Sequence, residues 1–590
     1  MNKIILILIL LLASFLRLWK LDQVPVSLFS DELDVGYQAY SIIKTGRDYS
    51  GNFLPLHFAS LAEFRTPLYI YASVPTVAVF GITPYGVRLP AAIFGILGVY
   101  GIYLLVNELF KGLDEKVKIF HTQFTSHQTL ALLSAFFLAI SPWHIQYSRA
   151  SFEVTMMITF LIFGLYFFLK YTKTGKALWL SALLLGLTPW VYSTAKLFIP
   201  FFVLVLITIW RKSFAGLKKL ELIKTIIVIL FLAIPMVFVT LKGQAGNRFS
   251  YISVFTDPTL ETDADYERLV DSKMRQVYGG GPLSKVASGL IHNKYSIIFS
   301  EISGNLLSSF STDFLFTRGD INLRHSIEGM GQFYRVEFLM LIFGAIVFFS
   351  DSQNKNNKYL MLSWLVIAVL PAALTRGGGT HATRSILMLP PLIFLISYGV
   401  YFVINDIKKP LNLVLVSGYF VMLIINFILY QHSYWYHNPW HSERSWHAGY
   451  KQLVLSVKEI EADYDKIIIT NAVEPPWIYF VSYYPFHPEK KPRDLEKEEV
   501  FGFGELEKLD KYYFGQVGKI GVKNLAKVLD DKTLYVAAER EVGENLIMDP
   551  DKVYKGLTLV KSIAYPSGEP AFYFFKKDDS VEVKSLEMIN

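Results

Sequence analysis

The chain has 590 residues, of which 52% are hydrophobic, 15% aromatic and only 18% charged, with a formal net charge of +7. Soluble proteins carry about a quarter charged residues, so this composition favours a polytopic membrane protein. The modest positive charge gives no reason to expect a nucleic-acid partner, and the absence of cysteine excludes disulfides and thiolate metal sites.

The N-terminal segment is predicted to be an uncleaved first span near residues 3–19. In MNKIILILILLLASFLRLWKL the apolar run passes directly into Arg17, Trp19 and Lys20, a pattern typical of a membrane interface. A signal peptide would show a shorter apolar region and a small-residue cleavage site. We therefore expect the amino end in the cytoplasm.

The first outer loop, residues 20–87, contains the stretch FSDELDVGYQAYSIIKTG at residues 29–46. Leu33, Tyr37 and Tyr40 follow one another at helical spacing, which predicts a short helix. Their apolar stripe is expected to face the membrane surface.

The acids of this predicted helix allow two interpretations. Asp31 and Glu32 lie away from the apolar stripe, and Asp34 is expected to be solvated. In one interpretation Ser30 or Asp31 caps the helix and the acids complement its dipole. In the other, a carboxylate beside an apolar region acts as a general base. Gly46 is the expected end of the helix.

Hydropathy predicts ten further spans. They lie near residues 88–107, 129–142, 153–170, 177–190, 196–210, 222–240, 336–350, 359–375, 384–404 and 411–430. With this set, the loop after every second span bears lysine and falls on the cytoplasmic side, as the positive-inside rule prefers.

A further apolar stretch, residues 66–84, would reverse this arrangement if it were a span. It is short for a hydrocarbon core of roughly 30 Å and contains Pro75. We therefore predict an interfacial or re-entrant helix here, eleven spans in all and a carboxyl end outside.

Outside the membrane we expect a long loop at residues 241–335 and a soluble domain after about residue 431. In that domain the apolar runs KIIIT, TLYVAA and AFYFF alternate with charged helical stretches such as YKQLVLSVKEIEADY, which favours a small α/β fold. The expected domains are thus a transmembrane domain at 1–430 and an extracytoplasmic α/β domain at 431–590.

Charged residues are nearly absent from the middle of the predicted spans and gather at their outer ends. The candidates are Asp31, Glu32, Arg65, Arg149, Glu153, Arg318, His325, His381 and Arg384. An ion-coupled transporter would carry such residues midway through its helices. The distribution instead predicts a polar site at the outer boundary, suited to a lipid-linked substrate with a charged head group.

Alternatives remain open for several of these residues. Arg65 either anchors the interface or binds a lipid phosphate in a bidentate way. Arg149 and Glu153, four residues apart, either form a helix ion pair or belong to the site. The RGD tripeptide at Arg318–Asp320 is weak evidence for adhesion and is better explained as part of a basic lip that includes His325. No nucleotide-binding loop, HExxH motif or nucleophile elbow appears in the sequence.

Several motifs together resemble membrane glycosyltransferases of the GT-C type, over residues 1–430. They are the acids Asp31 and Glu32, Thr45, Gly46 and Asp48, Arg65 with Pro67 to Tyr69, Phe80 and Gly81 with Arg88 to Pro90, and the stretch from Ser141 to Glu153. The chain is most similar to bacterial relatives of the dolichyl-phosphate-mannose protein mannosyltransferases and of the lipid A aminoarabinose transferase. The family has interfacial helices in its first outer loop.

The resemblance implies a function in the plasma or inner membrane. One sugar, a hexose or a pentose, would pass from a polyprenyl-phosphate carrier to a glycan, lipid or protein acceptor on the extracytoplasmic side, with inversion. A lipid monophosphate leaves as a stabilised anion, so no obligatory metal is predicted, although a divalent cation is left open.

The resemblance also assigns roles to residues. Asp31 would be the general base, Glu32 would orient the acceptor or the donor sugar, and Arg65 would hold the carrier phosphate. Glu153 falls where the family often has a second acid, more commonly Asp. Further positive charge around the phosphate would come from Arg149, Arg318, His325, His381 and Arg384.

A competing hypothesis is a non-catalytic binder or flippase of lipid-linked sugars. The charge-poor spans disfavour a polar pathway across the membrane. The C-terminal domain has no counterpart in the resemblance, and its position alone suggests acceptor recognition.

Overall fold

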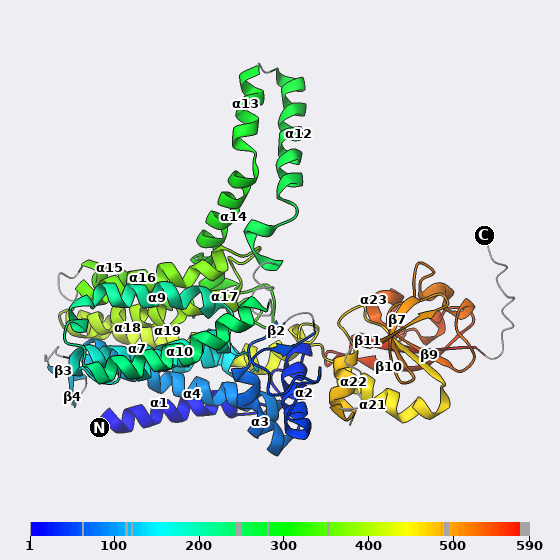
Figure 1. Ribbon diagram of the computed structural model, residues 1–590, viewed down its shortest axis with the longest axis horizontal. Coiled ribbons are helices and arrows are strands. Elements are labelled where there is room, and N and C mark those ends of the chain that lie inside the picture. Colours follow the sequence, from blue (N-terminus) through cyan, green and yellow to red (C-terminus); the bar gives the residue numbers. More distant parts are fainter. Residues whose placement is uncertain are drawn as a thin grey trace. The chain divides into compact units, whose positions relative to one another are not determined.

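A computed structural model of the protein divides into two compact units (Figure 1). One unit comprises Met1–Trp19 and Ala91–Ser433, and the other comprises Lys20–Pro90 and Tyr434–Asn590. The structure describes residues 2–61, 64–111, 116–119, 122–242, 251–279, 282–350, 355–484, 486–488 and 495–578.

The first unit is built mainly from helices, most of them apolar, whereas α12 (Leu260–Tyr278) is rich in charged residues. They are α1 (Asn2–Leu18), α4 (Pro84–Leu109), α5 (Ser126–Ile140), α6 (Pro142–Ser148), α7 (Val154–Thr174), α8 (Leu178–Val191), α9 (Thr194–Ile209), α10 (Lys219–Leu241), α12 (Leu260–Tyr278), α13 (Pro282–Ile291), α14 (Lys294–Ser309), α15 (Glu337–Ser350), α16 (Lys355–Ala373), α17 (Ala382–Ser385), α18 (Leu389–Asn405) and α19 (Leu411–His432). Two short antiparallel strands, β3 (Lys116–Ile119) and β4 (Thr122–Thr125), precede α5. Each of the eleven predicted spans falls on a helix.

Among the described residues, five helical stretches are long and apolar enough to cross a membrane. They are Pro84–Leu109, Val154–Thr174, Lys219–Leu241, Ala382–Asn405 and Leu411–His441. A sixth is counted if the pair His127–Ile140 and Pro142–Ser148, bent by 59°, forms one span. These helices indicate a multi-pass membrane protein, while the count of eleven spans and the orientation stay predictions.

The apolar stretch at 66–84 forms α3 (Leu68–Phe80), a helix of 13 residues with Pro75 inside it. At a rise of 1.5 Å per residue it is about 20 Å long, which is shorter than a bilayer core of about 30 Å. Because α8 and α15, which match predicted spans, have only 14 residues each, the interfacial or re-entrant position of α3 stays a prediction.

The predicted long outer loop at 241–335 contains three helices. α12 packs along α13 and α14, and the hairpin they form is drawn in green in Figure 1. Asn293 caps α14, since its side chain accepts hydrogen bonds from the backbone N–H groups of Tyr295 and Ser296. Residues 243–250 of this loop lie outside the described residues.

The second unit joins the predicted first outer loop to the C-terminal residues. From the loop come α2 (Ser30–Thr45), α3, β1 (Phe58–Ala59) and β2 (Phe64–Arg65). From the C-terminal part come α20 (Asn438–His441), α21 (Tyr450–Ile460), α22 (Trp477–Tyr483), α23 (Glu539–Val542) and strands β5 (Lys466–Ile469), β6 (Glu496–Val500), β7 (Gly504–Leu509), β8 (Tyr512–Phe514), β9 (Thr533–Ala538), β10 (Leu557–Ala564) and β11 (Pro570–Lys577).

The C-terminal strands form one seven-stranded mixed sheet in the order β10-β11-β9-β5-β8-β7-β6. The central strand β5 runs parallel to both β8 and β9, whereas the outer pairs are antiparallel. The predicted strands KIIIT, TLYVAA and AFYFF coincide with β5, β9 and β11, and the predicted helix with α21. The expected α/β fold is confirmed.

The apolar stripe of α2 lies in the core of the second unit. Leu33 and Tyr37 are fully buried in a cluster with Tyr450, Leu453 and Phe480 from the C-terminal part. The expectation that this stripe faces the membrane surface is therefore wrong for these two residues, because an apolar stripe shows that a face is buried but not what covers it. The two units divide the chain near residue 433, close to the expected boundary, but residues 20–90 belong to the unit of the C-terminal residues and not to that of the remaining helices.

Candidate functional site

Helix α2 carries Asp31 in its first turn, where a negative charge complements the helix dipole. The Asp31 side chain is half exposed and forms an ion pair with Arg65, whose own side chain is only 11% exposed. Arg65 also donates to the backbone carbonyl of Asp31 at 3.4 Å and to the Ser60 hydroxyl at 3.0 Å. A buried guanidinium thus holds an accessible carboxylate in place.

Asp34, one turn further along α2, is fully buried. Its Oδ2 accepts a hydrogen bond from the Ser60 hydroxyl at 2.8 Å and lies 3.3 Å from Arg65 Nε. Burial raises the pKa of the Asp34 carboxyl to about 6, although Arg65 and Ser60 act in the opposite direction. The expectation of a solvated Asp34 is wrong, because Ser60 and Arg65 lie against its carboxylate.

Glu32 and Arg88 form a fully buried ion pair. Arg88 Nε and Nη2 donate to the two Glu32 carboxylate oxygens, each at 2.8 Å. Arg88 also donates to the backbone carbonyls of Leu21, Pro25 and Ser27. These contacts support a structural role in which the pair fixes the start of α2, while the role of Glu32 in orienting a sugar stays a prediction.

The predicted capping of α2 is not observed. Phe29 occupies the N-cap position without a side-chain hydrogen bond, and the Ser30 hydroxyl donates instead to Glu474 Oε2 at 3.1 Å. The predicted end of the helix is confirmed, since Gly46 adopts a left-handed φ of 68° and its N–H donates to the Ile42 carbonyl.

In the first unit, two arginines at the ends of helices are fully buried. Arg149 follows α6 and donates to the Leu16 carbonyl at 3.0 Å. Arg17 lies 2.7 Å from His144 Nδ1 and donates to the Ala139 carbonyl at 3.0 Å. The Arg17 guanidinium therefore binds carbonyl groups inside the unit.

Glu153 and Arg318 lie at less buried positions of the same unit. Glu153 precedes the first turn of α7 and is partly buried. Arg318 is 81% exposed, with its Nε 3.4 Å from Asp313 Oδ1. Arg384, in α17, donates to the Thr375 hydroxyl at 2.9 Å.

A polar group in the first unit combines Asp320, His325 and His381. One ligand atom from each lies within 4.8 Å of the other two. A carboxylate and two imidazoles suit a zinc-like divalent cation, so these residues could hold one. The backbone N–H groups of Asn322 and Ala382 donate to the Asp320 carboxylate, each at 2.9 Å, and orient it.

Burial and neighbouring charges set the protonation of this group. Burial raises the pKa of the Asp320 carboxyl. The pKa of the His325 imidazole is lowered by burial and, further, by the positive charges of His381 and Arg324. Tyr147 stacks on His325, with its hydroxyl 3.0 Å from the Nδ1 atom. A neutral imidazole is the form that binds a metal ion.

The predicted residues therefore fall into two groups. Asp31, Glu32 and Arg65 belong to the second unit, and the structure brings Asp31 and Arg65 into direct contact. In the first unit it brings together His325 and His381, with ring centroids 5.2 Å apart. The remaining predicted residues of the first unit are Arg149, Glu153, Arg318 and Arg384.

Sequence reasoning missed three residues of these groups. Arg88 belongs to a family motif, but nothing local in the sequence pairs it with Glu32, which is 56 residues away. Asp320 lies in the RGD tripeptide, and the histidines at positions 325 and 381 were the available signal for its group. Nothing local in the sequence indicated the burial of Asp34.

No family model and no curated protein sequence matches the chain. Among solved structures it is similar to ArnT from Cupriavidus metallidurans bound to undecaprenyl phosphate, with 9% identity, a TM-score of 0.47 and coverage of 97% of both chains. The apo state of the same ArnT gives 10% identity and a TM-score of 0.45, again over 97% of both chains.

The chain is also similar to an oligosaccharyltransferase from Archaeoglobus fulgidus solved in complex with Zn and sulfate. The identity is 14% and the TM-score 0.42, over 81% of this chain and 61% of the other. This chain thus spans less than two thirds of that protein's length.

Proposed function

We propose that the protein is a membrane glycosyltransferase that moves one sugar from a polyprenyl-phosphate carrier to an acceptor on the extracytoplasmic side. The observation that carries this proposal is the Asp31–Arg65 pair, in which a half-exposed carboxylate is held by a largely buried guanidinium. A carboxylate fixed in this way, and open to solvent, suits a general base.

In the proposed reaction the Asp31 carboxylate takes the proton of an acceptor hydroxyl while the hydroxyl oxygen attacks the anomeric carbon. The bond between that carbon and the carrier phosphate oxygen breaks, and its electron pair leaves with the polyprenyl phosphate. The products are the glycosylated acceptor, polyprenyl phosphate and a protonated Asp31, which returns its proton to water. Attack opposite the leaving group inverts the anomeric configuration.

Arg65 is proposed to act first as a positioning residue for Asp31. Its contacts with Asp31, Asp34 and Ser60 support this role. Binding of the carrier phosphate by Arg65 is retained as a second part of the proposal, because a fixed cation offsets the charge that develops on the leaving phosphate.

The basic residues of the first unit remain proposed phosphate contacts. His325, His381 and Arg384 lie in segments predicted to be outside the membrane, and the two histidines share a group with Asp320 that could take a divalent cation. Such a cation would supply positive charge for a phosphate. The proposed reaction does not depend on it, since the leaving group is a stabilised monophosphate.

Substitution of Asp31 tests the proposal. With purified protein, radiolabelled polyprenyl-phosphate hexoses or pentoses and an acceptor glycan extract, Asp31→Asn should lower the rate of transfer by about 10²- to 10⁴-fold. Binding of the donor should remain close to that of the unmodified protein. The matched control is Asp22→Asn, which changes an exposed acid of the same loop.

Two results would contradict the proposal. Transfer by Asp31→Asn at the unmodified rate would remove Asp31 as the base. Movement of intact lipid-linked sugar across a vesicle membrane, with no cleavage of the carrier bond, would support the competing flippase.

A further inference from the structure

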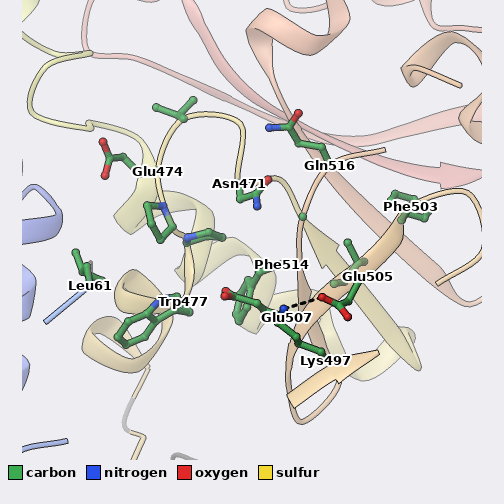
Figure 2. A pocket seen from close by; sticks show the side chains of 15 residues that line it. Leu61, Asn471, Glu474, Trp477, Lys497, Phe503, Glu505, Glu507, Phe514 and Gln516 are labelled. Carbon is green, nitrogen blue, oxygen red and sulfur yellow. Dashed lines mark hydrogen bonds and ion pairs between the residues drawn. The ribbon is translucent and has the colours of Figure 1, made fainter. Parts of the chain in front are cut away.

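The second unit contains a cavity of about 530 Å³ beside its central parallel strands (Figure 2). Asn471 follows β5 by two residues, and Gly515 and Gln516 directly follow β8. Because β5 and β8 are parallel, their carboxyl ends meet at the same edge of the sheet. Ligands of α/β sheets bind at this edge.

Three further elements complete the wall of the cavity. Trp477 opens helix α22, and the hairpin of β6 and β7 contributes Lys497, Glu505 and Glu507. Figure 2 shows the carboxylate of Glu505 paired with Lys497, at 2.6 Å. Leu61, from the first outer loop, lines the opposite part.

The charges of the lining disfavour an anionic ligand. The lining contains three carboxylates and one ammonium group: Glu505 pairs with Lys497, Glu474 lies 3.3 Å from His447 Nε2, and Glu507 adds a further negative charge. A phosphate or carboxylate ligand would meet net repulsion here. The carboxylates attract neutral polyols, whose hydroxyls donate hydrogen bonds, and amino sugars, whose ammonium adds an ion pair.

The uncharged lining residues suit a saccharide. The amides of Asn471 and Gln516 are exposed and offer both donors and acceptors. The indole of Trp477 is partly exposed and offers an apolar surface for the C–H face of a sugar ring. Amides, carboxylates and an aromatic ring together match a ligand that is polar at its edges and apolar on its faces.

Two features link the cavity to the group of Asp31, Asp34 and Arg65, here called the Asp31 group, within the same unit. Glu474, in the wall, accepts a hydrogen bond from Ser30, the residue directly before Asp31. Leu61 directly follows Ser60, whose hydroxyl bonds both Asp34 and Arg65. Leu61 therefore borders the cavity directly, and Ser30 contacts it through the wall residue Glu474.

We propose that this cavity binds a saccharide of the acceptor, in the form of a neutral or amino sugar. The inference rests on the proposed function and extends it, because it assigns the acceptor to the glycan class. The donor is excluded from the cavity since its phosphate would meet the carboxylates. The cavity then holds the acceptor glycan while one of its hydroxyls reaches Asp31.

Binding of simple sugars to the full-length protein in detergent tests the proposal. The probes are glucosamine, N-acetylglucosamine, maltose and inorganic phosphate, measured by saturation-transfer NMR and by isothermal titration. We expect at least one sugar to bind and phosphate not to compete. Trp477→Ala should weaken that binding by about tenfold, which corresponds to the loss of roughly 1.4 kcal/mol.

Matched variants separate the cavity from the rest of the surface. Trp440→Ala removes a 58% exposed indole elsewhere in the unit and should leave binding unchanged. Glu507→Gln should weaken glucosamine more than maltose, whereas Glu499→Gln, an exposed acid of β6 outside the cavity, should affect neither. Glu507 is exposed, so its substitution is informative even if Trp477→Ala fails to fold.

The transfer assay adds a functional measure. Trp477→Ala and Glu507→Gln should raise the KM for the acceptor and leave the KM for the donor unchanged. The proposal would be overturned if no sugar binds or if phosphate displaces the sugar. It would also be overturned if Glu507→Gln and the unmodified protein bind glucosamine equally. If no sugar binds but transfer still depends on Asp31, the cavity assignment fails and the proposed function stands. If sugars bind but Asp31→Asn transfers at the normal rate, the role of Asp31 in the proposed function fails and the sugar site stands.

Discussion

Replacement of Arg88 by Met is expected to destabilise the second unit strongly. Glu32 is fully buried, and Arg88 donates to both of its carboxylate oxygens. The substitution would leave a buried carboxylate without its countercharge and would also remove the donor to the carbonyls of Leu21, Pro25 and Ser27. Breaking a buried pair from one side costs about 3–5 kcal/mol, and we expect a loss in this range.

The opposite substitution should cost less, and this asymmetry follows from the contacts. In Glu32→Gln the guanidinium of Arg88 keeps its three backbone carbonyl acceptors, so we expect a loss of about 1–3 kcal/mol. The double variant should lose less than the sum of the two single variants, because it leaves no uncompensated carboxylate.

The assay is denaturant unfolding in detergent, followed by tryptophan fluorescence, with Arg47→Met as the control for loss of an exposed arginine. The reasoning is refuted if Arg88→Met destabilises no more than Arg47→Met. It is also refuted if the losses of the two single variants simply add.

Three other predictions concern pH, packing and metal. Because the pKa of Asp34 is raised from 3.8 to about 6, the folded state binds this proton more tightly than the unfolded state does. The free energy of unfolding should therefore fall by about 3 kcal/mol as the pH rises from 3.8 to 6. This pH dependence should shrink in Asp34→Asn, and an unchanged dependence would contradict the assignment. Gly36→Ala should destabilise by about 1–3 kcal/mol, since the added Cβ would lie 2.8 Å from Ile82 Cγ2 and 2.9 Å from Val87 Cγ1; Gly289→Ala, with nothing within 4 Å, is the control, and equal unfolding of the two variants would argue against the close packing. Treatment with EDTA should leave transfer measurable, because the proposed leaving group is a monophosphate; complete loss that Zn²⁺ restores would show instead that the aspartate–histidine group in the first unit holds a required cation.

Much of the helical and strand structure could be predicted because hydropathy and periodicity are local properties. The span at residues 153–170 matches α7, and the apolar run TLYVAA matches β9, because each segment carries its own signal. Gly46 was recognisable as the end of α2, since a left-handed residue there favours glycine.

The burial of charged groups could not be predicted in the same way. Asp34 is covered by Ser60, which is 26 positions away, and by Arg65 beyond it, and no local pattern indicates such contacts. Glu32 belongs to the same category, because its partner Arg88 is 56 residues further along the chain.

The surroundings of α2 show a second limit. The spacing of Leu33 and Tyr37 showed correctly that one face of the helix is apolar. It could not distinguish a membrane surface from a protein core, because both are apolar environments. Only the structure shows that these residues pack with Tyr450 and Leu453, more than 400 positions later in the chain.

The most direct test of the account is the stoichiometry of transfer by the unmodified protein. Purified protein in detergent would receive a polyprenyl-phosphate sugar labelled both in the sugar and in the phosphate, together with acceptor glycans. The account predicts one polyprenyl phosphate released for each labelled sugar joined to an acceptor, with inverted anomeric configuration and with dependence on Asp31. Tight binding of the donor with neither product formed, over a range of sugars and acceptors, would contradict it.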